Sequence, residues 1–133
     1  MCIFCKIVNN EIPSYKIYED DACLAFLDIS QTTIGHTLVI PKKHYDNIFS
    51  LDDEISSKIL GVVSKLSKKL SCSLKIKDIN IINNNGTLAG QTVNHFHMHI
   101  VPRYSDNDLK IDYISNKLTT EELIKLQQKI LDN

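Results

Sequence analysis

The sequence predicts an α+β domain built on a five-stranded antiparallel sheet. Short apolar segments bounded by turn residues occur five times, and one long segment between them has helical spacing. Three of the short segments precede the long one and two follow it, so strands and helices do not alternate regularly. This order is typical of antiparallel sheets with helices on their faces.

The strands are expected over residues 15–19, 22–28, 36–40, 78–83 and 93–101. Asp20 and Asp21 form the tight connection between the first two strands. Pro41 and Pro102 are expected to end the third and fifth strands, because proline has no N–H to donate to a sheet.

The long helix is predicted to begin with the capping signal at 50–53. Its apolar face carries Ile55, Ile59, Val62, Val63, Leu66 and Leu70. A shorter helix begins at 119–122 and should turn its apolar residues inward, namely Leu123, Leu126 and Ile130. We expect one domain over residues 1–133, with a core at about 2–104 and a C-terminal tail at 105–133.

The charge pattern limits the kinds of partner. The net charge is −1 and basic residues form no stripe, so we expect no binding to nucleic acid, although one small nucleotide is compatible. No apolar run approaches the ~20 residues of a membrane span, and the N-terminus turns polar by Asn9. We therefore expect no membrane partner, no signal peptide and a cytoplasmic location.

Three of the five histidines, His95, His97 and His99, occupy alternate positions of one apolar run. In an extended strand they would share one face, and Phe96 and Met98 would face the core. Three interpretations arise: a tridentate metal site, a nucleophile with orienting partners, or a polar sheet face. Same-face positions lie roughly 6.5–7 Å apart, which strains a single shared metal and favours the nucleophile. A neutral imidazole is nucleophilic at pH 7 and suits attack on phosphorus.

The run at 95–101 resembles the signature of the histidine triad (HIT) family, in which three histidines alternate with apolar residues. Segments 23–29, 35–44 and 90–93 resemble further family segments in the same order. The resemblance covers about residues 2–104. It implies a HIT-like fold whose sheet extends across a homodimer. It also implies a hydrolase of purine nucleoside monophosphates joined to a leaving group, above all phosphoramidates.

The resemblance also implies roles for individual residues. His97 would attack the α-phosphorus and form a nucleotidyl-histidine, and His99 would contact the phosphate. The transferase branch of the family places Gln where His99 stands, and this departure favours hydrolysis. His36 would support the triad. The remaining residues would bind the nucleotide: Asp28 the ribose, Gln91 and Thr92 the phosphate or leaving group with Asn84 close by, and Ile3, Phe4, Leu27 and Ile29 the base.

Plainer structural roles compete with these. Asp28 could cap a loop, His36 could be a buried histidine with satisfied hydrogen bonds, and Gln91 and Thr92 could be exposed residues at a strand entry. Arg103 could reach a phosphate or lie on the surface.

Cys2 and Cys5 form a Cys-x-x-Cys pair, which alone is a weak metal signal. Some bacterial HIT proteins bind zinc through two such cysteines and two histidines, and this resemblance implies a closed structural site of Cys2, Cys5, His44 and His95. The alternative is a pair of reduced thiols. Cys23 and Cys72 are expected to be small buried residues.

We expect a nucleotide hydrolase. A dinucleoside polyphosphate hydrolase, a purine-nucleotide-binding scaffold with weak catalysis, and a purely structural zinc module remain alternatives.

Overall fold

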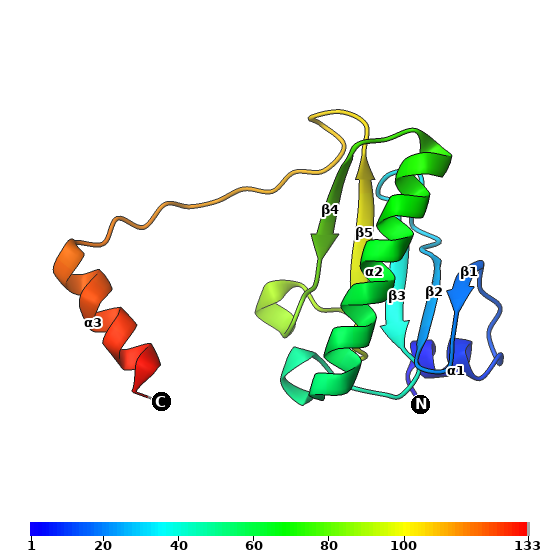
Figure 1. Cartoon of the computed structure of the whole chain (residues 1–133), viewed down its shortest axis with the longest axis horizontal. Helices are drawn as coiled ribbons and strands as arrows, with labels where there is room; N and C mark the ends of the chain where they lie inside the picture. The colour runs from blue at the N-terminus through cyan, green and yellow to red at the C-terminus, as the bar shows by residue number, and fades with distance from the viewer. Residues whose placement is uncertain (133) are drawn as a thin grey trace.

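One antiparallel sheet organises the computed structural model, which describes residues 1–132 (Figure 1). Its strands are β1 (Lys16–Glu19), β2 (Cys23–Leu27), β3 (Thr37–Pro41), β4 (Asp78–Ile82) and β5 (Met98–Arg103). They lie in the order β1-β2-β3-β5-β4, and every neighbouring pair is antiparallel. The predicted α+β class and five-stranded sheet are confirmed.

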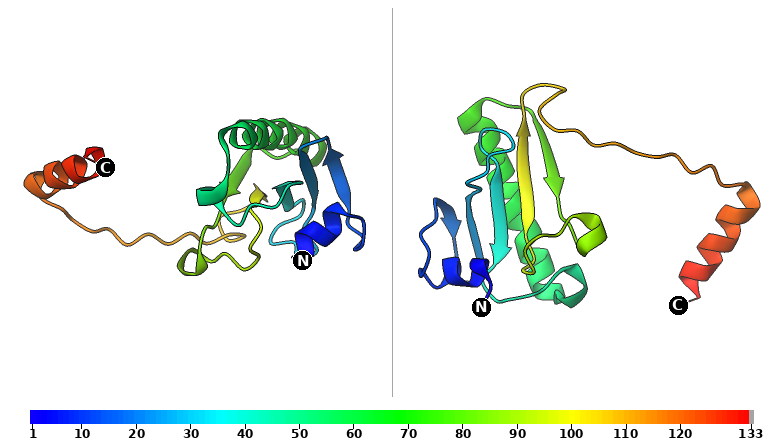
Figure 2. Two further views of the ribbon diagram at one scale, coloured as in Figure 1. Left: turned by 90° about the horizontal axis from the view of Figure 1, so that it is seen from below. Right: turned by 180° about the vertical axis from the view of Figure 1, so that it is seen from behind.

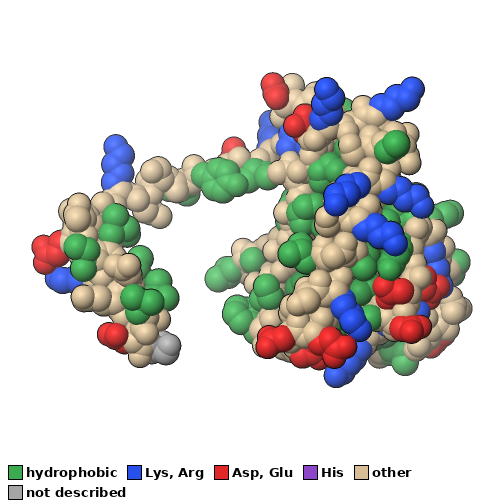
Figure 3. All heavy atoms as spheres, in the orientation of Figure 1, with side chains coloured by type: hydrophobic (Ala, Val, Ile, Leu, Met, Phe, Trp, Pro, Cys, Tyr) green, Lys and Arg blue, Asp and Glu red, His purple; other side chains and the backbone are tan. Residues whose placement is uncertain are grey.

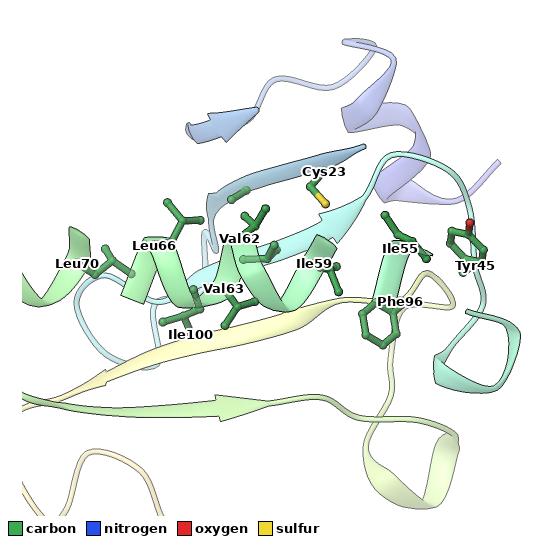
Figure 4. Packing of buried hydrophobic residues seen from close by; sticks show 12 residues of the cluster. Cys23, Tyr45, Ile55, Ile59, Val62, Val63, Leu66, Leu70, Phe96 and Ile100 are labelled. Carbon is green, nitrogen blue, oxygen red and sulfur yellow. The ribbon is translucent and has the colours of Figure 1, made fainter. Parts of the chain in front are cut away.

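Helix α2 (Asp53–Leu74) covers one face of this sheet. The Asp52 carboxylate caps its start by accepting from the Ile55 N–H at 3.0 Å, and Lys75 ends it in the left-handed region with φ 55°. The six predicted apolar residues are buried against Cys23, Val39 and Ile100 of three strands (Figure 4). Burying each aliphatic side chain contributes about 1.5–3 kcal/mol, so this contact fixes the helix on the sheet.

A short helix that we did not predict, α1 (Ile3–Val8), lies against the opposite face (Figure 2). Its Phe4 and Ile7 pack on side chains from β2 and β3, namely Leu24, Phe26, Leu38 and Ile40. Six residues are too few for a helical period to stand out, and the start of α1 is capped by the Cys2 side chain rather than by a usual capping residue.

The fifth strand differs from our prediction at both ends. It begins at Met98 because the preceding backbone bonds to loops: the Phe96 N–H donates to the Tyr45 carbonyl and the Asn83 amide to the His97 carbonyl. It continues through Pro102, since β3 pairs with β5 only as far as Ile100 and leaves that side of Pro102 without a strand neighbour. Pro41 likewise belongs to β3 as its last residue.

The C-terminal helix α3 (Thr120–Leu131) begins where expected, with Thr119 and Glu122 forming a capping box. Its apolar residues do not turn inward as predicted: Leu123, Leu126 and Ile130 are 44–66% exposed. An extended tail carries α3 away from the sheet, and the space-filling view shows it apart from the body with hydrophobic side chains uncovered (Figure 3). Local sequence forms this helix, but the rest of the same chain does not cover it.

Cys23 is fully buried as expected, whereas Cys72 is exposed on α2, outside the helix's apolar face. Within residues 1–132, no helix combines the length and apolar character needed to cross a membrane. Two single-turn helices, η1 (Ile48–Ser50) and η2 (Thr87–Ala89), shape the loops beside the start of β5.

Candidate active site and metal cluster

The triad histidines keep the predicted division of faces although only His99 lies within β5. Phe96 and Met98 pack into the core under α2. His95 and His97 lie on the other side, where both rings contact the ring of Phe4 edge-on, with centroids 5.9 and 5.2 Å away. The residues before β5 are therefore extended enough to alternate, without being paired in the sheet.

His97 has one ring nitrogen fixed and the other free. Its Nδ1 lies 2.7 Å from the His95 carbonyl oxygen, and because a carbonyl only accepts, Nδ1 must carry the proton. The Nε2 of the neutral ring then holds an available lone pair. Burial lowers the pKa of His97 below its ordinary value, so the ring is neutral at pH 7.

His36 and His99 form a chain of hydrogen bonds whose direction can be assigned. The Thr32 N–H donates to His36 Nδ1 at 3.3 Å, so His36 Nε2 carries the proton and donates to His99 Nδ1 at 2.9 Å. The remaining Nε2 of His99 is consequently an N–H donor. Burial, with the neighbouring His97 and His36, lowers the pKa of His99 to about 4.

Asp28 caps a turn and also borders the predicted site. One carboxylate oxygen accepts from the Ser30 N–H at 2.8 Å, which caps the turn after β2. The other lies 3.8 Å from His36 Nε2. The same side chain borders the apolar cavity below, so loop capping does not remove it from the site.

An apolar cavity of about 150 Å³ opens between α1 and the strand face beneath it. We call this cavity the slot. It is lined by the four residues predicted to hold a base, Ile3, Phe4, Leu27 and Ile29, together with Asp28. Residues from α1, the α1–β1 loop, β2 and β3 complete it: Ile7, Ile12, Pro13, Ser14, Phe26 and Leu38.

The other predicted phosphate contacts have different surroundings. The Gln91 side-chain amide bonds to the surrounding loop backbone: it accepts from the Gly86 N–H and donates to the carbonyls of Asp46 and Val93. Thr92 is exposed. Asn84 lines a second small cavity of about 160 Å³ beside His36 and His99.

Arg103 is held away from any phosphate role. It bonds to the Asp108 carboxylate and the Asn80 side chain, and to the carbonyls of Ser105 and Leu109. Its function here is to fasten the start of the tail to the end of β5.

Cys2, Cys5, His44 and His95 converge as predicted, with one ligand atom from each inside a 4.8 Å cluster. The two sulfurs lie 3.3–3.6 Å from the Nδ1 atoms of both histidines. Tetrahedral zinc with ordinary bond lengths places sulfur and nitrogen ligands about 3.6 Å apart. The distances therefore fit zinc.

The protonation of the two histidines also suits a metal. His95 Nε2 donates to the Pro41 carbonyl at 2.8 Å, and His44 Nε2 donates to the Asp46 carboxylate at 2.8 Å. In the neutral rings both protons are thus on Nε2, and the Nδ1 lone pairs face the cysteine sulfurs.

Sequence reasoning missed the residues that hold the site from behind. Asn83 donates to the His97 carbonyl at 2.9 Å, and Asn85 links Asn83 to the Ile48 N–H. Asp46 orients His44 and accepts, through its own carbonyl, from Gln91. The run of three asparagines at 83–85 is a local signal for them, but such a run before a glycine indicates only a turn.

A family model described as HIT domain matches residues 9–106, and these include all three triad histidines. The chain belongs to the histidine triad (HIT) family. The Bacillus subtilis relative named Protein hit is 50% identical over 107 residues, which are 80% of this chain and 74% of the relative. The crystal structure of a HIT family protein from Bacillus anthracis is 48% identical, with a TM-score of 0.94 over 98% of this chain and 95% of that one.

Two further HIT relatives bear on chemistry. The adenosine 5'-monophosphoramidase of Schizosaccharomyces pombe is 40% identical over 130 residues, 97% of this chain and 95% of the relative. A Zn-bound histidine triad family protein from Mycobacterium smegmatis is 34% identical, with a TM-score of 0.78 over 98% of this chain and 95% of that one. Membership and these relatives support a nucleotide hydrolase.

Proposed function

We propose that this HIT protein hydrolyses purine nucleoside 5'-phosphoramidates through attack of His97 Nε2 on the α-phosphorus. The observation that carries the proposal is the hydrogen bond from His97 Nδ1 to the His95 carbonyl. It holds the ring proton on Nδ1 and leaves the lone pair of Nε2 available for attack. The phosphoramidase relative supports the substrate class.

The reaction runs in two displacements. In the first, the bond from His97 Nε2 to phosphorus forms, and the bond from phosphorus to the substrate's nitrogen breaks as that nitrogen takes a proton from the solvent and leaves as an amine. The ring becomes a cation, which the His95 carbonyl stabilises by continuing to accept from Nδ1. In the second, water attacks phosphorus and gives up a proton to the solvent, while the electron pair of the P–N bond returns to Nε2, which releases the nucleoside monophosphate.

His99 assists by donating a hydrogen bond from its Nε2–H to a phosphoryl oxygen. The hydrogen-bond chain from Thr32 through His36 supports this role, since it occupies His99 Nδ1 and leaves the N–H outward. A fixed donor at this point stabilises the charge that develops on the phosphoryl oxygens.

The slot and Asp28 supply binding. A purine ring is flat and apolar on both faces, and the slot is narrow and lined by aliphatic and aromatic side chains. The Asp28 oxygen facing His36 accepts from the ribose hydroxyls. Thr92, and Asn84 beside His99, are the remaining candidates for the phosphate and leaving group.

We also propose that Cys2, Cys5, His44 and His95 hold a structural zinc ion. The sulfur–nitrogen distances and the Nδ1 lone pairs directed at the cysteine sulfurs support this assignment, as does the Zn-bound relative. Four protein ligands close the coordination shell, so the ion serves to cross-link α1 to the segments around β3 and β5 and not to activate water.

A homodimer is the third part of the proposal. All residues from 110 to 132 are exposed, and α3 presents an apolar face that its own chain leaves uncovered. The Bacillus anthracis structure matches 98% of the chain, which includes most of α3. A helix that keeps one position without contacting the rest of its own chain is held there by another molecule. A second copy docked on α3, beside the free edge of β4, would extend the sheet.

Turnover of adenosine 5'-phosphoramidate by wild type and His97→Ala tests the catalytic proposal. We expect the variant to lose at least about 1,000-fold in kcat, because the nucleophile itself is removed. Wild-type protein quenched in alkaline denaturant, in which the P–N bond survives, should carry a nucleotide on His97 that mass spectrometry detects. Unchanged activity in the variant would exclude His97 as nucleophile, and AMP binding without any wild-type turnover would favour the scaffold.

A further inference from the structure

The small cavity of about 160 Å³ beside His36 and His99, which we call the second cavity, has no assigned occupant. Its lining comes from the loop before β3, from β4 and β5 with the loop after β4, and from the start of the tail. Its walls are three aliphatic residues, two histidines and two uncharged polar residues: Ile82, Val101, Leu109, His36, His99, Thr32 and Asn84. Among these seven residues none carries a carboxylate, an ammonium or a guanidinium group.

The strand register places the second cavity in one row with the slot. Phe26 of β2 is paired with Leu38 of β3, and both line the slot. Leu38 is paired with His99 of β5, and His99 is paired with Ile82 of β4, where the second cavity lies. Directly paired residues place their side chains on the same face of a sheet. The slot, the ring of His99 and the second cavity therefore follow one another across the strands, in the strand order of Figure 1.

The direction of attack points the leaving group toward the same cavity. His97, His99 and Val101 occupy alternate positions of one extended segment, so on this face His97 lies on one side of His99 and Val101 on the other. In a displacement at phosphorus the attacking and leaving atoms are roughly in line. With a phosphoryl oxygen bonded to His99, attack from His97 expels the amine toward Val101 and Ile82.

We propose that the second cavity binds the substituent on the leaving amine and selects compact apolar substituents. The inference rests on the proposed function, since it requires the base in the slot and attack by His97. Aliphatic walls favour the burial of hydrocarbon, whereas a charged substituent would meet no opposite charge among the seven lining residues. An apolar cavity of about 150 Å³ holds benzene, so a substituent of about four to six carbon atoms suits this volume.

Leu109 closes the second cavity from the tail. Its carbonyl accepts from Arg103 Nη2 at 3.1 Å, and Arg103 also bonds to the carboxylate of Asp108, so this part of the tail is fastened to β5. Leu109 is half-buried, whereas Ile111, two residues further along the tail, is exposed and lies outside the lining. The tail thus offers a variant and a matched aliphatic control in one segment.

The experiment compares kcat/KM of wild type for adenosine 5'-phosphoramidates that carry methyl, isobutyl or 3-hydroxypropyl on nitrogen. Methylamine and isobutylamine have similar basicity, so the difference between them reports binding and not leaving-group ability. Wild type should prefer isobutyl to methyl by about 10-fold, because three more carbon atoms are partly buried. It should also prefer isobutyl to 3-hydroxypropyl, which has as many non-hydrogen atoms but would bury a hydroxyl group.

The variants test where this preference arises. Leu109→Ala should lower the isobutyl-to-methyl ratio by about 3-fold, and Ile82→Ala, which removes a wall on β4, should lower it similarly. Ile111→Ala should keep the wild-type ratio. Leu27→Ala, in the slot, should lower kcat/KM for all three substrates by a common factor, because all three share the base.

Equal kcat/KM of wild type for the three substrates would overturn the inference and leave the proposed function standing. The wild-type ratio in both Leu109→Ala and Ile82→Ala would also overturn it, since the preference would then arise outside the second cavity. No turnover of any substrate by wild type would overturn the proposed function and this inference with it.

Discussion

His97 and His99 illustrate how the backbone sets the chemistry of a side chain. Both are neutral imidazoles, yet His97 presents a lone pair at Nε2 and His99 presents an N–H there. The difference arises because His97 Nδ1–H donates to the His95 carbonyl, whereas His99 Nδ1 accepts from His36. The Thr32 N–H donates to His36, and His36 donates in turn to His99, so one backbone N–H determines which nitrogen of His99 carries the proton. Alternation along the strand places the rings, and their partners assign their roles.

Because the pKa of His99 is lowered to about 4 from 6.5, stability should depend on pH. Between these values the unfolded chain binds a proton that the folded chain does not, so the free energy of unfolding should fall as pH decreases from about 6.5 to 4 and level off below. The loss from this residue should be on the order of 2–3 kcal/mol.

Urea denaturation of wild type and His99→Gln between pH 7.5 and 4 measures this effect. Glutamine keeps an acceptor for the His36 N–H but does not titrate, so its stability curve should be shallower while the two proteins agree more closely at pH 7.5. Parallel curves would show that His99 titrates alike in the folded and unfolded chains.

At the scale of elements, α1 shows how a long-range contact makes a short helix. Six residues do not form a stable helix in water, and Phe4 and Ile7 alone bury a small area. Cys2 and Cys5 bring α1 against His44, after β3, and His95, before β5. A zinc ion at these ligands would hold α1 over the slot and over the ring of His97.

Metal analysis of purified protein should therefore find about one zinc per chain. Cys5→Ser should lose the zinc, and amide hydrogen exchange in residues 3–9 should become faster as α1 opens. Cys72→Ser is the control, since Cys72 is exposed on α2 and away from the cluster. Wild type that contains almost no zinc, or an α1 that remains protected in Cys5→Ser, would contradict this role.

Prediction of elements succeeded where one local pattern decided the structure. The spacing from Ile55 to Leu70 predicted α2, and short apolar segments bounded by turn residues predicted the sheet. It failed at α1, which depends on residues 40 and 90 positions away, and at the start of β5, where Tyr45 and Asn83 take the backbone hydrogen bonds that a strand neighbour would have taken. Such partners have no signature in the local sequence.

At the scale of the whole molecule, α3 is the part that a single chain does not explain. Its capping box and amphipathic pattern form a helix, while the tail from 110 to 118 leaves that helix apart from the body. An isolated helix of this length is marginal in water, so its apolar face requires a partner surface.

Leu126→Asp should therefore weaken the homodimer, because it places a charge in the apolar face of α3. Light scattering after gel filtration should give a dimer for wild type and a larger monomer fraction for Leu126→Asp at equal concentration. Gln128→Asp introduces the same residue on the other side of the helix and should remain dimeric. Monomeric wild type at micromolar concentration would contradict the proposal.

The sequence by itself determined the α+β class, the helices α2 and α3, and the sharing of faces by the histidines, which follow from local periodicity that short-range sterics and burial enforce. The resemblance of its motifs to the HIT family identified the four residues of the cluster and five of the eleven residues that line the slot. Tertiary structure decided which histidine nitrogen carries the proton, that Gln91 and Arg103 fasten loops, and that α3 lies apart. The donor role of His99 and the position of Gln91 depend on partners distant in the chain, His36 and Asp46, and no local pattern encodes such contacts.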